Sequence, residues 1–376
     1  MKKWMKIVAF LLAMLMLGSA FVACNDEDEP PAEEPEDDTS PKVEEKEIDV
    51  YLIAGQSNAA GSTTCKNGNG TLYKEAEAIL EEFPALKTGT PYIQYAGNSA
   101  GNSPNNSVTY GFRDVELGLG ASKSKMGPEV GMAYALSSVY NEQTGKHAAI
   151  IKYAHGGTGL VRTEANGGTD GNWEPPSYRA HAADDPDREY RGFLYRGFLE
   201  EVGAYLYQLK KDGYTKITLK GLYWMQGCND TWRYTTGEET TKKSPNWYPE
   251  AFACLVKDWR DALAQIMKDM KMSPASAQNL PFFIGTISAT YRMDGDPTNG
   301  TVAATEARNL PFIAMQKKLA EDNEKCYVVD NSGYHTMKYE DGQYKVLGTD
   351  ASHWGVADCY QIGKNAGNAM LENGYK

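Results

Sequence analysis

Five short apolar runs constrain the fold of this chain more than any other feature of its sequence. They contain almost no polar alternation, so a strand built from any of them must be covered on both faces. Longer stretches with helical periodicity separate the runs and can provide that cover. The simplest architecture is a three-layer α/β/α sandwich with a central parallel sheet. The expected strands are residues 50–55, 148–155, 216–225, 281–290 and 326–330.

Helical spacing is clearest in two stretches between these runs. Apolar residues form a single stripe between residues 194 and 209 and another between 252 and 270. Further helices are expected near 305–322 and 356–372. Residues 62–125, rich in Gly, Asn and Tyr, fit an insertion, and so do residues 333–347, where KYEDGQYKV predicts a hairpin turning at Asp341-Gly342. Insertions of this size are often functional, and surface decoration is the alternative.

The N-terminus has the layout of an export signal, residues 1–23. Three lysines precede the apolar run IVAFLLAMLMLGSAFVA. Ala23 followed by Cys24 resembles a lipobox, in which the cysteine is lipidated and becomes the new N-terminus, although Phe21 departs from the usual leucine. An uncleaved membrane anchor is the alternative. Either way we expect an exported protein held at a membrane, periplasmic or at the cell surface.

Residues 24–47 are expected to form an extended tether. From Asn25 to Glu47 there are twelve acidic residues, two basic residues and four prolines, a composition that repels itself and cannot build a core. The whole chain has a net charge of −12; the leader contributes +3 and the tether −10, which leaves −5 for residues 48–376. No basic stripe exists to release counterions from a nucleic acid, so none is expected as a partner.

The cysteines do not indicate a metal site. Apart from Cys24 there are five, without CxxC spacing, so zinc is not expected. An exported chain can form one or two disulfides from such a set, but the sequence does not assign the partners.

Polar clusters follow three of the expected strands. GQSN occupies residues 55–58, HGGT residues 155–158 and QGCND residues 226–230. Ligands of parallel α/β sheets collect beyond the carboxyl ends of the strands. We therefore expect the three clusters to meet at one rim of the sheet.

Ser57, directly after the first strand, is the candidate nucleophile at this rim. At the start of a helix its hydroxyl is exposed and its N–H is free to face an anion, while a helix cap is the alternative. Near the other end of the chain, Asp350 and His353 are separated by two residues, so the carboxylate can reach the imidazole and fix its tautomer. Such a pair is what a serine nucleophile needs. His353 follows the last strand and can meet Ser57 across the rim.

An acyl-transfer site also needs donors for the developing oxyanion. The N–H of Ser57 is one candidate. Gly156 or Gly157 can supply a second, because glycine permits close approach, and the amides of Gln226 and Asn229 are further candidates. Ordinary turn chemistry is the alternative for each.

Substrate contacts are expected around the serine. Gln56 and Asn58 flank it, and Arg162 can meet a carboxylated sugar. Trp232 can stack on a sugar ring, although most aromatic residues belong to the core. The other aromatic candidates for stacking are Tyr234, Trp247 and Tyr248.

The motifs GQSNAAG, GPEVGMAYAL, AHGGTGL, GLYWMQGCND and DASHW, in this order, resemble the blocks of the SGNH-hydrolase superfamily, in its branch of sialate O-acetylesterases and carbohydrate esterase family six. The resemblance implies a flavodoxin-like sandwich that removes acetyl groups from sugars without metal or cofactor. It implies Ser57 as nucleophile, His353 as general base and Asp350 as the residue that orients it. Ser57, a glycine of the GG pair and Gln226 would form the oxyanion hole.

Two positions depart from that branch. Cys228 stands where an acidic residue usually follows QG, and Trp173 comes later than the tryptophan that usually follows GGT. Glu129, in GPE, either holds the rim together through hydrogen bonds or lies in the first turn of a helix, where the dipole favours it.

The sequence thus predicts an esterase domain over residues 48–376 that deacetylates a glycan of the acetylxylan or O-acetyl sialic acid type, with no cofactor. A glycan-binding lipoprotein on an inactive esterase scaffold is the main alternative, because fold and function can separate. An esterase acting on peptidoglycan or lipid acyl groups is another, although the chain lacks a long apolar loop that could serve as a lipid lid.

Overall fold

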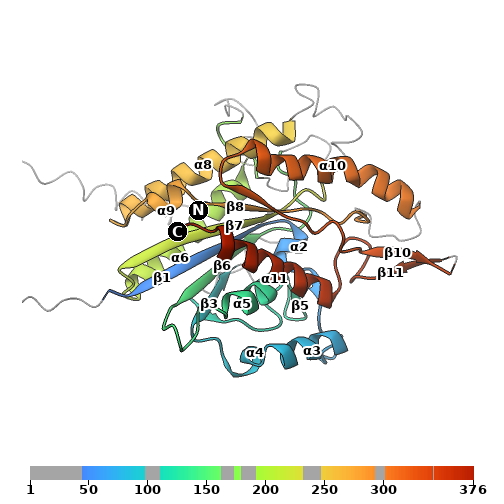
Figure 1. The fold of residues 1–376 in the computed structure, drawn as a ribbon, viewed down its shortest axis with the longest axis horizontal. Coiled ribbons are helices and arrows are strands. Elements are labelled where there is room, and N and C mark those ends of the chain that lie inside the picture. The colour runs from blue at the N-terminus through green and yellow to red at the C-terminus, as the bar shows by residue number, and fades with distance from the viewer. Residues whose placement is uncertain are drawn as a thin grey trace, which may run out of the picture. The chain divides into compact units, whose positions relative to one another are not determined.

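The expected apolar strands lie side by side in one central sheet of a computed structural model (Figure 1). The structure describes residues 45–97, 111–161, 173–178, 192–231, 247–292, 301–341 and 343–376. The strands of this sheet are β1 (Glu47–Gly55), β3 (Ile93–Gly97), β4 (Arg113–Asp114), β6 (Ala148–Ala154), β7 (Lys216–Met225), β8 (Phe282–Gly285) and β9 (Cys326–Val329). Their spatial order is β4-β3-β6-β1-β7-β8-β9, and every neighbouring pair is parallel except β3 and β4.

Without β3 and β4 of the insertion, the order β6-β1-β7-β8-β9 is that of a flavodoxin-like sheet. In such a sheet the first strand along the chain, here β1, lies between the second, β6, and the third, β7. This confirms the predicted fold class. The expected insertion at residues 62–125 does more than decorate the surface, because β3 and β4 extend the β6 edge of the sheet. It also supplies β2 (Thr63–Thr64) and β5 (Lys125–Met126), which pair with each other as a small antiparallel ladder.

Strand β1 shows why the apolar runs lack polar alternation. Successive side chains of a strand point to opposite faces of the sheet. Val50, Leu52 and Ala54 join one hydrophobic cluster, whereas Tyr51 and Ile53 join the other. All five are fully buried, because helices cover both faces.

The helices form the two outer layers (Figure 1). One cluster contains side chains from α6 (Phe193–Lys211), α8 (Trp247–Asp269), α9 (Ala275–Gln278) and α10 (Val302–Asp322). The other contains side chains from α2 (Ser57–Ala60), α3 (Lys74–Glu82), α4 (Ala85–Thr88), α5 (Glu129–Leu136) and α11 (Val356–Asn373). The two apolar stripes and the two later helices predicted from the sequence are therefore confirmed, with bounds that differ by a few residues.

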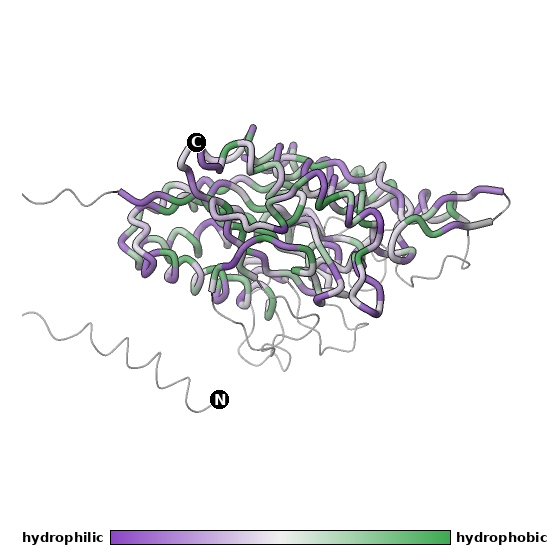
Figure 2. The backbone as a smooth tube through the Cα atoms, turned by 90° about the horizontal axis from the view of Figure 1, so that it is seen from below, coloured by the Kyte–Doolittle hydropathy of each residue, from purple (hydrophilic) through white to green (hydrophobic). Residues whose placement is uncertain are grey.

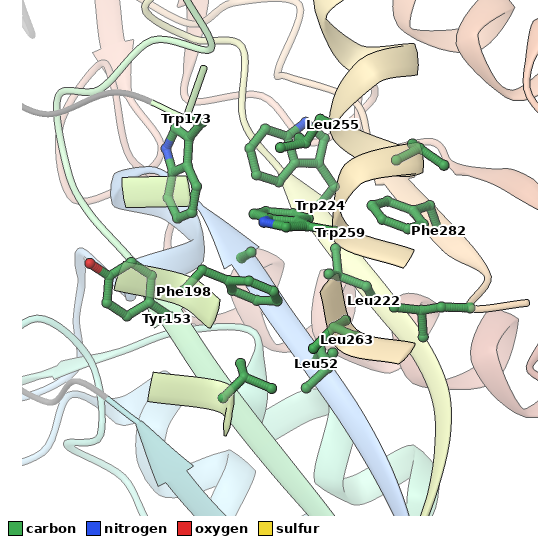
Figure 3. Close-up of a cluster of buried hydrophobic side chains, with 14 of the residues drawn as sticks. Leu52, Tyr153, Trp173, Phe198, Leu222, Trp224, Leu255, Trp259, Leu263 and Phe282 are labelled. Carbon is green, nitrogen blue, oxygen red and sulfur yellow. The ribbon is translucent and has the colours of Figure 1, made fainter. Parts of the chain in front are cut away.

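A group of aromatic rings packs beneath the rim on the α6 and α8 face (Figure 3). Trp259 stacks on Phe198, with ring centroids 4.1 Å apart, and meets Trp224 and Trp173 edge-on. Such contacts add to the burial of large apolar surfaces. They fix the end of β7, at Trp224, against the helices that cover it.

The predicted hairpin is present as β10 (Met337–Glu340) and β11 (Gln343–Val346), which flank the expected turn and pair in antiparallel fashion. It projects from the domain in both views (Figures 1 and 2). By contrast, β8 is shorter than predicted. After Gly285 the N–H of Thr286 still bonds to the carbonyl of Val329, but that of Ile287 turns to the side chain of Gln316 on α10.

No disulfide joins cysteines in the described part of the chain: Cys65, Cys228, Cys254, Cys326 and Cys359 are all free thiols. No helix among the described residues is both long and apolar enough to span a bilayer. The predicted export signal, Cys24 and nearly all of the acidic tether lie outside the described residues.

Candidate functional site

The turn after β1 explains why glycine precedes the serine motif. Gly55 has φ of +144°, and a Cβ atom there would lie 2.1 Å from the carbonyl oxygen of Met225 at the end of β7. Only glycine allows this approach. The N–H of Gln56 then bonds to the same carbonyl at 3.1 Å, and Ser57 begins helix α2. The first N–H groups of a helix have no acceptor within it, so the half-buried Ser57 lies where donors are available.

The structure brings the three predicted polar clusters together. The N–H of His155 bonds to the carbonyl of Gly55 at 3.0 Å. The side-chain oxygen of Gln56 accepts hydrogen bonds from the backbone N–H groups of Gly227 and Asn229, at 3.1 and 3.3 Å. Gln56 is only 1% exposed, and its side chain holds the loop after β7 in place. Its contact with a substrate stays a prediction.

Gln226 is fixed by partners within the protein. Its amide nitrogen donates to Asp230 Oδ2 at 2.6 Å and to the carbonyl of Thr158 at 3.1 Å, and its oxygen accepts from the hydroxyl of Tyr248 at 2.7 Å. A primary amide has two hydrogens, and both have acceptors here. Donation from Gln226 to an oxyanion therefore stays a prediction, one that requires an exchange of partners. Asp230 also accepts the N–H of Leu160, at 2.8 Å.

Asn58 joins the serine helix to the loop that contains His353. Its amide nitrogen donates to the carbonyl of Ser352 at 3.2 Å, a contact that spans 294 residues of sequence. The same nitrogen lies 4.0 Å from the sulfur of Cys228. The immediate neighbours of Ser57 and His353 are therefore bonded to each other, which places both residues at the same rim.

His353 and Asp350 form a close pair. The Nδ1 atom of His353 lies 2.8 Å from Asp350 Oδ2 and 3.0 Å from Oδ1. Oδ1 also accepts the backbone N–H groups of Ser352, at 2.7 Å, and of His353, at 2.9 Å. Partial burial by itself would raise the pKa of Asp350. The hydrogen bond to the His353 ring, the charge of that ring and the two backbone N–H groups together hold the pKa below its usual value. The carboxylate thus stays ionised and fixes the ring with Nε2 pointing away.

The His353 loop is attached to the segment that follows α2. Thr64 donates its N–H to the hydroxyl of Thr349 at 2.9 Å, and the hydroxyl of Thr63 donates to the carbonyl of Trp354 at 3.0 Å. These bonds hold both ends of the loop against β2.

The other oxyanion candidates lie at the same rim. Gly157 is exposed with φ of +73°, and Gly156 is half-buried. Nδ1 of His155 lies 3.0 Å from the carbonyl of Gly156, so this histidine bonds to its own turn. Asn229 is half-buried and bonds to Gln56 through its backbone. The roles of these residues in stabilising an oxyanion stay predictions.

The stacking role considered for two aromatic residues is wrong. Trp247 and Tyr248 are buried in the cluster under α8, because the first turn of this helix faces the sheet, and they offer no surface to a sugar. Trp232, Tyr234 and Arg162 lie outside the described residues.

The structure describes both residues at which the chain departs from the family motifs. Burial raises the pKa of the Cys228 thiol to about 12, against a smaller lowering by the hydrogen bond from Asn58, so this side chain is a neutral thiol and not a nucleophile. Trp173, although it comes late in the sequence, donates its Nε1–H to the hydroxyl of Thr158 at 3.1 Å. The tryptophan therefore still lies beside the GGT turn.

The sequence assigned no role to two residues of this region. Asp230, which ends the predicted QGCND cluster, organises the rim through Gln226 and Leu160. Lys152, fully buried in β6, was treated as an ordinary strand residue, although a lysine in the run AAIIKYA was itself a signal. Within the described ranges, no group of three His, Cys, Asp or Glu side chains is placed to hold a metal ion.

The chain matches the family model described as carbohydrate esterase, sialic acid-specific acetylesterase, over residues 47–338. No curated protein matches it. Among solved structures, NanS has a TM-score of 0.50 at 14% identity and covers 87% of this chain and 98% of its own. A protein from Arabidopsis thaliana has a TM-score of 0.47 at 14% identity, covering 86% and 98%. A carbohydrate acetylesterase from Xanthomonas citri has 0.43 at 13%, covering 86% and 56%.

The likeness to NanS shows the fold. The family match stops before Asp350 and His353, but it extends over well over half of the chain, including the serine motif and the loops after β6 and β7. The chain belongs to the family of carbohydrate esterases described as sialic acid-specific acetylesterases.

Proposed function

We propose that this protein is a serine-dependent acetylesterase that removes acetyl groups from an acetylated carbohydrate. Family membership supports the reaction class. The observation that carries the proposed mechanism is the His353–Asp350 pair, held to the helix of Ser57 by the bond from Asn58 to Ser352.

In the proposed reaction, Ser57 Oγ attacks the acetyl carbonyl while Nε2 of His353 takes the hydroxyl proton. The carbonyl electrons move onto oxygen and return when the bond to the sugar oxygen breaks, and His353 protonates that oxygen as the sugar leaves. Water then attacks the acetyl-serine and gives its proton to His353. The ester bond to Ser57 breaks, the serine regains its proton, and acetate is released. Asp350 stabilises the charged imidazole throughout.

The proposed oxyanion donors are the N–H of Ser57, the N–H of Gly156 or Gly157, and the side chains of Gln226 and Asn229. Preorganised donors at such a position each contribute roughly 10²- to 10³-fold in kcat. Gln226 can take part only if it gives up its bond to Asp230 or to Thr158.

Acetate release by the purified protein tests the proposal. We expect hydrolysis of an aryl acetate by the wild type, and a loss of roughly 10⁴- to 10⁶-fold in kcat for Ser57→Ala and His353→Ala. Ser137→Ala is the matched control, because Ser137 only caps the far end of α5. Unchanged turnover by Ser57→Ala would reject the mechanism.

The specific substrate that we propose is an acetylated glycan of the acetylxylan or O-acetyl sialic acid type. A panel of acetylated polysaccharides and acetylated sialic acids, scored by acetate release, identifies it. Binding to one of these glycans without any turnover would instead support a non-catalytic glycan-binding protein, the alternative that the fold allows.

The cellular site is also a proposal, which rests on the sequence of the leader. We infer cleavage before Cys24 and lipidation of this residue, with the acidic segment as tether. The protein should then fractionate with membranes, and Cys24→Ser should release it. A mature N-terminus elsewhere than Cys24 contradicts the proposal.

A further inference from the structure

Lys152 is a buried cation in β6, two residues before the end of the strand that leads to the HGGT turn. Its side chain and that of Glu129, the first residue of α5, are both 0% exposed, and Nζ lies 2.9 Å from Glu129 Oε2. Charged side chains are almost never fully buried unless they are paired. A buried ion pair is weak evidence for stability, because a well-packed apolar pair often serves as well. The presence of this one therefore calls for another reason.

All three donors of the Lys152 ammonium group have acceptors. Besides Glu129, Nζ donates to the carbonyl of Ala60 at 3.1 Å and to the carbonyl of Leu119 at 3.0 Å. An ammonium group has three N–H donors, so its hydrogen-bonding capacity is complete. Ala60 is the last residue of α2, the helix that Ser57 begins. The cation thus holds the carboxyl end of the single turn that presents the nucleophile.

The backbone around this contact leaves no room for adjustment. Gly61, which ends α2, has φ of +91°, and a Cβ atom on it would lie 2.8 Å from both Gly120 Cα and the Gly127 nitrogen. The carbonyl of Gly61 accepts the N–H of Ala121 at 2.9 Å, and Glu129 Oε1 accepts the N–H of Gly127 at 2.9 Å. The Lys152–Glu129 pair therefore fixes the end of α2 and the two loops packed on it as one unit.

We propose that Lys152, supported by Glu129, is a positioning residue that sets the place of Ser57 by holding helix α2 from its carboxyl end. This inference rests on the proposed function of Ser57. A single helical turn has little stability of its own, so the direction of α2 depends on the contacts made to it. A cation at the carboxyl end of a helix is also favoured by its dipole. A shift of the reacting atoms by about 1 Å can cost roughly 100-fold in rate.

The test is the double variant Lys152→Met/Glu129→Leu, which removes both charges together and keeps the volume near the original. Two quantities are measured: kcat and KM for an aryl acetate, and the rate constant for covalent inactivation by a phosphonate reagent that reacts with activated serines. We expect both rate constants to fall by roughly 10- to 100-fold, with KM within about twofold of the wild type.

Tyr140→Phe is the matched control. It breaks a buried polar chain at the other end of β1, in which the Tyr140 hydroxyl lies 2.7 Å from that of Tyr51 and 2.7 Å from Asp49 Oδ2. We expect this change to leave kcat unaltered, even where it lowers the free energy of unfolding. A double variant that retains the kcat of this control, or that changes KM alone, overturns the proposal.

Should the double variant not fold, Glu129→Gln replaces it in the test. Glutamine keeps the volume and one acceptor oxygen, and we expect kcat to fall at least about fivefold at unchanged KM, since one of the two bonds made by Glu129 is lost. An unchanged kcat rejects the inference. If the wild type neither turns over the ester nor reacts with the phosphonate, it is the proposed function of Ser57 that fails.

Discussion

Glu201 on α6 is a buried carboxyl group without an ionic partner among the described residues. It is 9% exposed, and its Oε1 atom has no hydrogen-bond partner. Desolvation raises its pKa from 4.5 to about 7. Its charge acts on the phenols of Tyr95 and Tyr153, which offer no positive charge in return. We predict that Glu201→Gln stabilises the protein at alkaline pH.

The magnitude follows from linkage. The two pKa values differ by about 2.5 units, and each unit corresponds to about 1.4 kcal/mol, so the ionised side chain costs the folded state about 3 kcal/mol. The folded-state pKa is the higher one. The contribution of protonated Glu201 to the free energy of unfolding is therefore fully present below pH 4.5, and it is lost as the pH rises through about 7. Glutamine does not ionise and retains it at every pH.

Urea denaturation of both proteins at pH 5 and pH 8.5 measures the effect. The advantage of Glu201→Gln in the free energy of unfolding should be about 2 to 3 kcal/mol larger at pH 8.5 than at pH 5. Glu200→Gln, a change at the exposed neighbouring position, is the control and should show no such difference. An advantage that is equal at both pH values, or a loss of stability at pH 8.5, would refute the assignment of a buried, unpaired carboxylate.

Two further predictions concern the site. Asp350→Asn should lower kcat by about 10⁴-fold, because the charge that orients His353 is lost. The fold should stay intact, because the bonds of Asp350 lie within its own loop. Steady-state kinetics and circular dichroism check this, and full activity would contradict it. Gly55→Ala should lower the free energy of unfolding by at least about 2 kcal/mol and reduce turnover, because the new Cβ collides with the carbonyl of Met225 in a backbone conformation that alanine avoids. Its control in urea denaturation is Gly68→Ala, where a Cβ meets open space, and equal stability of the two variants would exclude the collision.

The sheet could be predicted because its strands are buried on both faces. The runs around Leu52, Ile151 and Leu222 have no polar side, and the helices α6 and α8 show one apolar stripe each. Strand β3 was not predicted. Its sequence IQYAG is short and contains Gln94, and it lies within a segment whose composition resembles loops. Its place at the edge depends on pairing with β6, which local sequence does not reveal.

The rim could be located from the sequence, but the direction of each side chain could not. Gln56 and Gln226 follow their strands as expected, yet both amides point into the protein and bond to neighbouring loops. Whether a polar side chain after a strand turns inward depends on acceptors from distant segments, such as the carbonyl of Thr158 for Gln226. The Asp350–His353 pair could be predicted because its geometry is local, set by a three-residue spacing.

What assembles the proposed site is a set of polar contacts between the two ends of the domain. The fold itself rests on packing within the two apolar clusters, whereas the His353 loop is held to the Ser57 segment by single hydrogen bonds from Asn58, Thr63 and Thr64. Each such bond contributes only about 1 kcal/mol, so the contact between these two segments can open at a lower cost than the sheet can unfold, while the buried Ala351 and Trp354 still anchor the loop. Esterase activity should therefore be lost before the core melts, because Ser57 and His353 move apart first.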